Sequence, residues 1–102
     1  MCKQKQHIVA TVYNAKGHII ASARNSYTKT HPKQAKFAKL ANNPEAIFLH
    51  AEIAALVKCR KKPHRISVVR YMKDGTTGNA EPCGICKLAI KEAGIKFVEY
   101  SV

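Results

Sequence analysis

The chain has 102 residues, of which 46% are hydrophobic, and its 18 Lys and Arg against six Asp and Glu give a formal net charge of +12. This length excludes two independent cores, so residues 1–102 are expected to form one domain. No apolar run approaches the roughly 18 residues of a membrane-spanning helix, and no apolar stretch typical of a secretory signal follows the N-terminus, which favours a cytoplasmic protein. The charge fits a solvated basic surface or attraction to a polyanion or a phosphorylated small molecule equally well.

The first part of the chain predicts a β-hairpin followed by a basic excursion. HIVATVYN (7–14) has apolar residues on both faces of a strand, and after the NAKG turn HIIASAR (18–24) pairs back on it. SYTKTHP (26–32) is polar, and KQAKFAKLANNP (33–44) has apolar residues at helical spacing. We expect a loop and a short basic helix here, bordering the mouth of the functional site with its lysines, Lys29, Lys33, Lys36 and Lys39.

The remainder predicts two helices and two strands. EAIFLHAEIAALVKCRKK (45–62) is the strongest helical segment, with a basic last turn that the helix macrodipole favours. HRISVVRYM (64–72) is expected to be a strand, and TTGNAE (76–81) a loop. PCGICKLAIKEAG (82–94) has proline at its start and glycine at its end, as helices prefer, and IKFVEYSV (95–102) is the last strand.

This order of elements predicts a three-layer α/β domain, helix–sheet–helix, around a mixed sheet of about four strands. The hairpin and two β–helix–β crossovers imply a mostly parallel part of the sheet with a hairpin strand at one edge. The last strand would leave an open edge that needs a cover or a partner.

A histidine and two cysteines carry the strongest functional signal. His50 lies near the start of one predicted helix, and Cys83 and Cys86 lie at the start of the next. These helices follow connections at the same end of the sheet, so their N-termini can converge, and cysteines at i and i+3 share a helical face. One imidazole and two thiolates fit three corners of a tetrahedral zinc site. Because no fourth protein ligand is evident, the pattern predicts a catalytic zinc ion with a corner open to water.

Glu52 lies two residues past His50 and is not needed as a ligand. Beside metal-activated water a carboxylate can take up a proton and deliver it to a substrate, which makes Glu52 the candidate proton shuttle. A glutamate in a first helical turn also fits ordinary macrodipole chemistry, and the cysteine pair favours the catalytic interpretation. Cys2 and Cys59 have no motif around them and are expected to be free thiols.

The sequence H-A-E at 50–52 followed by P-C-G-I-C at 82–86 resembles the zinc-dependent cytidine and deoxycytidylate deaminase superfamily. The resemblance covers most of the chain, and the order of strands and helices agrees from the hairpin to the last strand. It implies a cytidine-deaminase-like fold in which His50, Cys83 and Cys86 hold Zn²⁺ and Glu52 moves the protons.

The resemblance also implies substrate contacts at three further positions. Asn25 is similar to the asparagine that binds the sugar or base edge in the family, although turn chemistry explains an asparagine there equally well. The backbone at Ala51 corresponds to the group that reads the ring carbonyl. Tyr27 could stack on the base, or simply pack beside a loop.

Local cues point to different branches of the superfamily. CKLAIKEAGIKFVEYS (86–101) is most similar to the deoxycytidylate branch, EPC (81–83) resembles the tRNA adenosine and guanine deaminases, and PCGIC followed by a basic residue resembles free cytidine deaminases. The chain begins directly at the first predicted strand, without the helix that usually precedes it in the family, and stops after the fourth predicted strand. We therefore carry over to this chain no substrate contact that the family makes from its C-terminal part.

The sequence thus predicts a zinc-dependent hydrolytic deaminase that converts cytosine to uracil in a free (deoxy)cytidine nucleotide such as dCMP. One alternative is deamination of cytosine, or adenine, in single-stranded DNA or RNA, which the charge of +12 encourages. An alternative of another class is a zinc-stabilised nucleic-acid-binding module without catalysis. The small core, the open edge strand and the common oligomerisation of the family predict a homo-oligomer without membrane partners.

Overall fold

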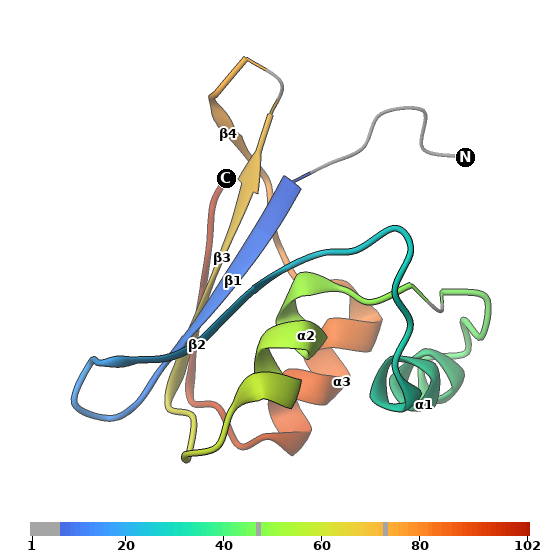
Figure 1. The fold of residues 1–102 in the computed structure, drawn as a ribbon, viewed down its shortest axis with the longest axis horizontal. Helices are drawn as coiled ribbons and strands as arrows, with labels where there is room; N and C mark the ends of the chain where they lie inside the picture. Colours follow the sequence, from blue (N-terminus) through green and yellow to red (C-terminus); the bar gives the residue numbers. More distant parts are fainter. Residues whose placement is uncertain (1–6, 47, 73) are drawn as a thin grey trace.

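The sheet begins with the expected hairpin and continues through a third long strand. The computed structural model describes residues 7–46, 48–72 and 74–102 (Figure 1). Antiparallel pairing joins the two hairpin strands and also joins the first of them to the third, whereas the last strand pairs with the third in parallel. A two-residue strand pairs with the end of the third strand. The strands are β1 (His7–Tyr13), β2 (Ile19–Arg24), β3 (Arg65–Tyr71), β4 (Thr77–Gly78) and β5 (Phe97–Tyr100).

The predicted mixed α/β fold is confirmed, but the sheet has more antiparallel pairing than expected. The first crossover carries the chain from β2 to β3, and β3 docks beside β1 instead of β2. β1 is therefore antiparallel to both of its neighbours, and β3–β5 is the parallel pair of the described chain. β2 lies at an edge, as predicted. β4 falls in the segment predicted to be a loop, because two residues are too few to show a strand periodicity.

Three helices form where the sequence predicts them: α1 (Pro32–Leu40), α2 (Ala51–Lys58) and α3 (Gly84–Glu92). α2 is shorter than the predicted segment, since it begins only after His50 and ends before Cys59. None of the helices in the described part of the chain is long and apolar enough to cross a membrane.

The inner face of the sheet packs against α2 and α3. Ala10 and Val12 of β1 lie opposite Val68 and Ile66 of β3, and all four side chains are fully buried. Ile90 of α3 belongs to the same cluster, together with alanines of α2. Burial of an aliphatic side chain of this size contributes about 1.5–3 kcal/mol, so this cluster fixes the helix pair against one face of the sheet.

The predicted helix–sheet–helix layering is wrong, because all three helices lie on the same side of the sheet (Figure 1). α2 is buried along Ala51–Ala55, and its Ile53 packs with Phe37 of α1 and Ile85 of α3 in a second cluster. Among the described residues α1 packs on α2 and α3 but not on the strands. The layers are therefore the sheet, the α2–α3 pair and α1, and α2 is covered on both sides, as its apolar composition requires.

Candidate metal centre and active site

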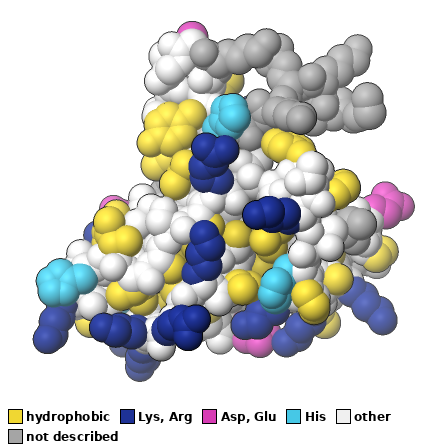
Figure 2. All heavy atoms as spheres, viewed as in Figure 1, with side chains coloured by type: hydrophobic (Ala, Val, Ile, Leu, Met, Phe, Trp, Pro, Cys, Tyr) yellow, Lys and Arg dark blue, Asp and Glu magenta, His cyan; other side chains and the backbone are white. Residues whose placement is uncertain are grey.

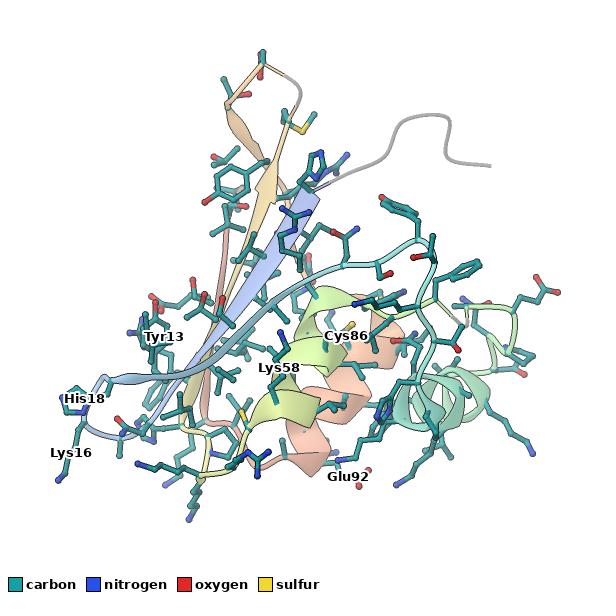
Figure 3. The ribbon with its side chains drawn as sticks, in the orientation of Figure 1. Tyr13, Lys16, His18, Lys58, Cys86 and Glu92 are labelled. Carbon is teal, nitrogen blue, oxygen red and sulfur yellow. The ribbon has the colours of Figure 1, made fainter. Side chains whose placement is uncertain are left out.

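The N-termini of α2 and α3 bring one histidine and two cysteines together. His50 is the N-cap residue of α2, Cys83 is the N-cap residue of α3, and Cys86 lies one turn into α3. Their ligand atoms all lie within 4.8 Å of one another. Figure 3 places Cys86 at the end of the helix pair opposite Glu92. The convergence predicted from the sequence is thus present in the structure.

The spacing of these donor atoms suits a tetrahedral zinc ion. Nδ1 of His50 lies 3.3 Å from Sγ of Cys86 and 3.6 Å from Sγ of Cys83. Bond lengths of about 2.3 Å to sulfur and 2.0–2.1 Å to nitrogen put the N and S corners of a zinc tetrahedron about 3.5 Å apart. Cys86 is fully buried, whereas Cys83 is exposed. The cluster is therefore closed on the protein side and accessible on the other.

The three donor groups already form a polarised cluster. The hydrogen bond from the Cys86 thiol, followed by the bond with His50, lowers the pKa of Cys83 to about 3 despite partial burial. The same hydrogen bond and burial raise the pKa of the Cys86 thiol, and the bond to Cys83 raises the pKa of His50. One sulfur is thus stabilised as a thiolate, which is the form that binds metal.

Glu52 lies in the first turn of α2 beside this cluster, and only 5% of its surface is exposed. Burial raises the pKa of its carboxyl, while hydrogen bonds from the backbone and from Cys86 partly offset that effect. A carboxyl group whose pKa is shifted towards neutrality is suited to accept and return a proton.

Gln34 of α1 holds the backbone of the metal cluster in place. Its side chain is fully buried, its Oε1 accepts a hydrogen bond from the backbone N–H of His50 at 3.2 Å, and its Nε2 donates to the carbonyl of Ala46 at 2.9 Å. The sequence analysis missed this residue. The signal was available, since Gln34 is a polar residue on the helical face that also carries Phe37 and Ala38.

A cavity of about 470 Å³ opens over the cluster, a volume within the range of small-molecule sites. Its lining includes two of the three candidate metal donors, His50 and Cys83, together with Glu52 and every residue for which the sequence analysis expected a substrate contact. The residues concerned are Asn25, Tyr27, His50, Ala51, Glu52 and Cys83. Cys86 lies behind them, buried under the cavity floor.

Asn25 has a structural role as well as a place in this lining. Its Oδ1 accepts a hydrogen bond from the N–H of Ile8 at 3.0 Å, and its own N–H donates to the carbonyl of Ile8 at 3.1 Å. These bonds close the open end of the β1–β2 hairpin. Tyr27 lies further out on the rim and is 39% exposed. Ser26 donates its N–H to the carbonyl of Leu49, which fixes this rim beside α2.

The basic segment does not border the cavity as predicted. The lining of the cavity includes Tyr27 but none of the lysines of the segment. Lys36 instead pairs with Glu92 at 3.2 Å, at the opposite end of α3 from the cysteines. Lys and Arg side chains are spread over the face seen in Figure 2 and do not gather in one patch.

The sequence analysis missed further residues of the lining, among them Phe48, Arg70 and Asn79. Glu81, which was noted near the candidate chemistry, does line the cavity, and its carboxylate pairs with Lys87 at 3.0 Å. Cys59 is a half-buried free thiol away from the cluster, as expected, and Cys2 lies outside the described residues.

The fold and the cluster are those of an α/β protein with a His/Cys/Cys metal centre at the N-termini of two helices. A family model of the cytidine and deoxycytidylate deaminase zinc-binding region matches residues 1–102, and the chain belongs to this family. The resemblance that the sequence analysis identified is thereby confirmed, and Zn²⁺ is the cofactor that the family and the donor set support. No curated protein gives a significant match to the chain.

Proposed function

We propose that this protein is a zinc-dependent hydrolytic deaminase that converts cytosine to uracil in a free cytosine nucleotide such as dCMP. The observation that carries the proposal is that one cavity is lined by two candidate metal donors, His50 and Cys83, and by a buried carboxyl group, Glu52. In this proposal His50 Nδ1, Cys83 Sγ and Cys86 Sγ hold the zinc ion.

The chemistry divides between the cofactor and the chain. Zinc in such a site supplies water activated for hydrolysis. Glu52 takes up a proton, delivers it to the ring nitrogen next to the amino-bearing carbon and then protonates the departing amine, so that cytosine and water give uracil and ammonia. Burial of Glu52 keeps competing water away from these transfers.

Three residues of the lining position the substrate in this proposal. Ala51 is the first residue of α2, so its backbone N–H has no carbonyl partner within the helix and can donate to the ring carbonyl. Asn25 contacts the sugar or the base edge, and Tyr27 stacks on the base at the rim.

A second candidate substrate is cytosine, or adenine, in single-stranded DNA or RNA. The charge of +12 favours it, because lysines and arginines outside the cavity could follow a polynucleotide backbone. A zinc-stabilised binding module without catalysis would use the same surface but would not need a buried carboxyl group facing the cavity.

A panel of substrates tests the proposal. Zinc-loaded protein is incubated with dCMP, deoxycytidine, cytidine, dAMP and a cytosine-containing oligonucleotide, and the products are read by mass. We expect the shift of about one mass unit that replacing an amino group by oxygen produces, largest for dCMP. If only the oligonucleotide is deaminated, the substrate is cytosine in single-stranded nucleic acid and not dCMP. If no substrate is deaminated, the enzymatic proposal is refuted in favour of a zinc-stabilised nucleic-acid-binding module.

We also propose that the protein is a homo-oligomer. β5 pairs with β3 along one edge, and all four of its residues are exposed, including Phe97 at 55%. An exposed strand edge of this kind is a template for pairing with a second copy. Light scattering should give at least twice the monomer mass at tens of micromolar protein. This concentration is about the Kd of a modest interface. A clean monomer would refute the assembly.

A further inference from the structure

Arg70 occupies an inward-facing position of β3 where the strand pattern calls for an apolar residue. Ile66 and Val68 alternate along the inner face of β3 and are fully buried, and Arg70 is the next residue in that alternation. It lies near the end of the strand that faces the N-termini of α2 and α3, and its side chain lines the cavity together with Glu52 and Cys83.

Among the described residues that line this cavity, Arg70 is the one lysine or arginine, although the chain has 18 such residues. None of the ion pairs in the described part of the chain includes its guanidinium, and Glu81 of the same lining is paired with Lys87. Its Nε is shielded from solvent and makes no hydrogen bond. A shielded N–H without a partner is unfavourable in a folded protein, so a ligand group that accepts a hydrogen bond from Arg70 would be favoured.

The backbone around Arg70 is fixed on both sides. Its N–H donates to the Ser101 hydroxyl at 3.1 Å, and the same hydroxyl donates to the carbonyl of Gly78, which lies opposite Arg70 in β4. A side chain at Gly78 would meet Met72 Sδ at 2.9 Å and Arg70 Cδ at 3.6 Å. β4 therefore lies against the aliphatic part of Arg70 and limits the positions that this side chain can take.

We propose that Arg70 binds the phosphate of the substrate and selects nucleotide over nucleoside, an inference that rests on the proposed deaminase function. A confined guanidinium presents paired N–H donors that match a phosphate oxyanion. One cation among the described residues of the lining matches one phosphate, which favours a mononucleotide over several phosphates of a strand. The basic residues that would follow a strand lie outside the cavity.

Substrate pairs that differ only in the phosphate test this inference. The Arg70→Gln variant should lower kcat/KM for dCMP by about 10- to 100-fold, the range that loss of a hydrogen bond to a charged group implies. The effect should lie mainly in KM, and kcat/KM for deoxycytidine should fall far less than kcat/KM for dCMP. Arg70→Lys, which keeps the charge but not the paired donors, should fall between wild type and Arg70→Gln. Arg60→Gln, at an exposed arginine outside the cavity, is the matched control and should behave as wild type.

A binding measurement separates this inference from the proposed function. Calorimetry should show wild-type protein binding dUMP more tightly than deoxyuridine, with the difference lost in Arg70→Gln and kept in Arg60→Gln. Equal losses for dUMP and deoxyuridine, or no wild-type preference for the phosphate, would overturn the role of Arg70 even if deamination is observed. An Arg70-dependent preference for an oligonucleotide over dCMP would likewise refute the mononucleotide assignment. If deamination is absent, the dUMP preference still decides whether Arg70 binds phosphate. Zinc content and melting temperature of each variant verify that it folds.

Discussion

Replacing Gln34 by methionine should weaken both the fold and the metal centre, although Gln34 touches no metal donor atom. Methionine has nearly the volume of glutamine, so the change removes hydrogen bonds without leaving a large cavity. Two backbone groups lose their partner, the N–H of His50 and the carbonyl of Ala46. A buried group left without a hydrogen bond costs about 1–3 kcal/mol. Both contacts are only partly buried, so the lower end of that range, about 1–1.5 kcal/mol, applies to each.

The expected loss is therefore about 2–3 kcal/mol of unfolding free energy, a large share of the 5–15 kcal/mol that is typical of a small domain. This corresponds to a fall in Tm of roughly 10–20 °C for a chain of this size. Because the lost bond also orients the residue that carries Nδ1, zinc affinity should fall by about 10- to 100-fold, as for other outer-shell changes at metal sites.

Thermal unfolding and competition with a chromogenic zinc chelator measure the two effects. Lys39→Met, on the exposed side of the same helix, is the matched control and should change neither quantity appreciably. A Gln34→Met protein with wild-type zinc affinity would refute the positioning role, even if its Tm is lower. A Tm within about 2 °C of wild type would instead refute the estimate for the unpaired backbone groups.

Two further predictions concern the metal and the proton shuttle. Cys83→Ala should reduce zinc from about one per chain to nearly none. A chelator should lower the Tm of wild type but not of this variant, because a ligand present at about 1,000 times its Kd adds roughly 4 kcal/mol to the stability of the native state. Full zinc occupancy in Cys83→Ala by elemental analysis would contradict the ligand assignment. Glu52→Gln should keep zinc and Tm while kcat falls by about 10²- to 10⁴-fold, the usual contribution of a general acid–base. Near-normal turnover of this variant would exclude Glu52 as the shuttle, and Glu45→Gln, an exposed glutamate outside the cavity, serves as its control.

The elements that the sequence predicts well are those defined by local patterns. The hairpin follows from alternation around the NAKG turn, and α3 follows from Pro82 at its start and Gly94 after its end. The metal cluster was predictable for the same reason, because the spacing of Cys83 and Cys86 is a helical spacing and His50 begins the preceding helix.

Features that depend on long-range pairing were not predictable from local patterns. Nothing in β3 alone indicates that it docks beside β1 and not beside β2. The two crossovers, from β2 to β3 and from β3 to β5, run in the same direction across the sheet, so right-handed connections place α2 and α3 on one side. Gln34 and Arg70 were missed for a related reason. Each is a polar residue at an inward position, and its partners become visible only when the segments around Ala46 and Gly78 are brought to it.

The contrast between the helix N-termini explains why the donor residues lie where they do. His31 caps α1 in the ordinary way, since its Nδ1 accepts a hydrogen bond from the N–H of Lys33. His50 and Cys83 occupy the same N-cap position of α2 and α3, but neither side chain makes a capping hydrogen bond. An N-cap side chain is worth about 0.5–2 kcal/mol, so these two helices lack a stabilisation that serine or aspartate would supply.

This loss is offset only if the uncapped side chains gain another partner. The positive end of each macrodipole favours an anion, and a thiolate at Cys83 satisfies that preference even before metal binds. A bare divalent cation near two helix N-termini would be repelled, whereas a cation bound by the two thiolates of Cys83 and Cys86 forms a neutral unit that both helix ends tolerate. Replacing both cysteines by histidine would keep three donors but leave the charge of the metal uncompensated. Thiolate ligands at these two helix N-termini therefore compensate the charge of the metal, which neutral donors would not do.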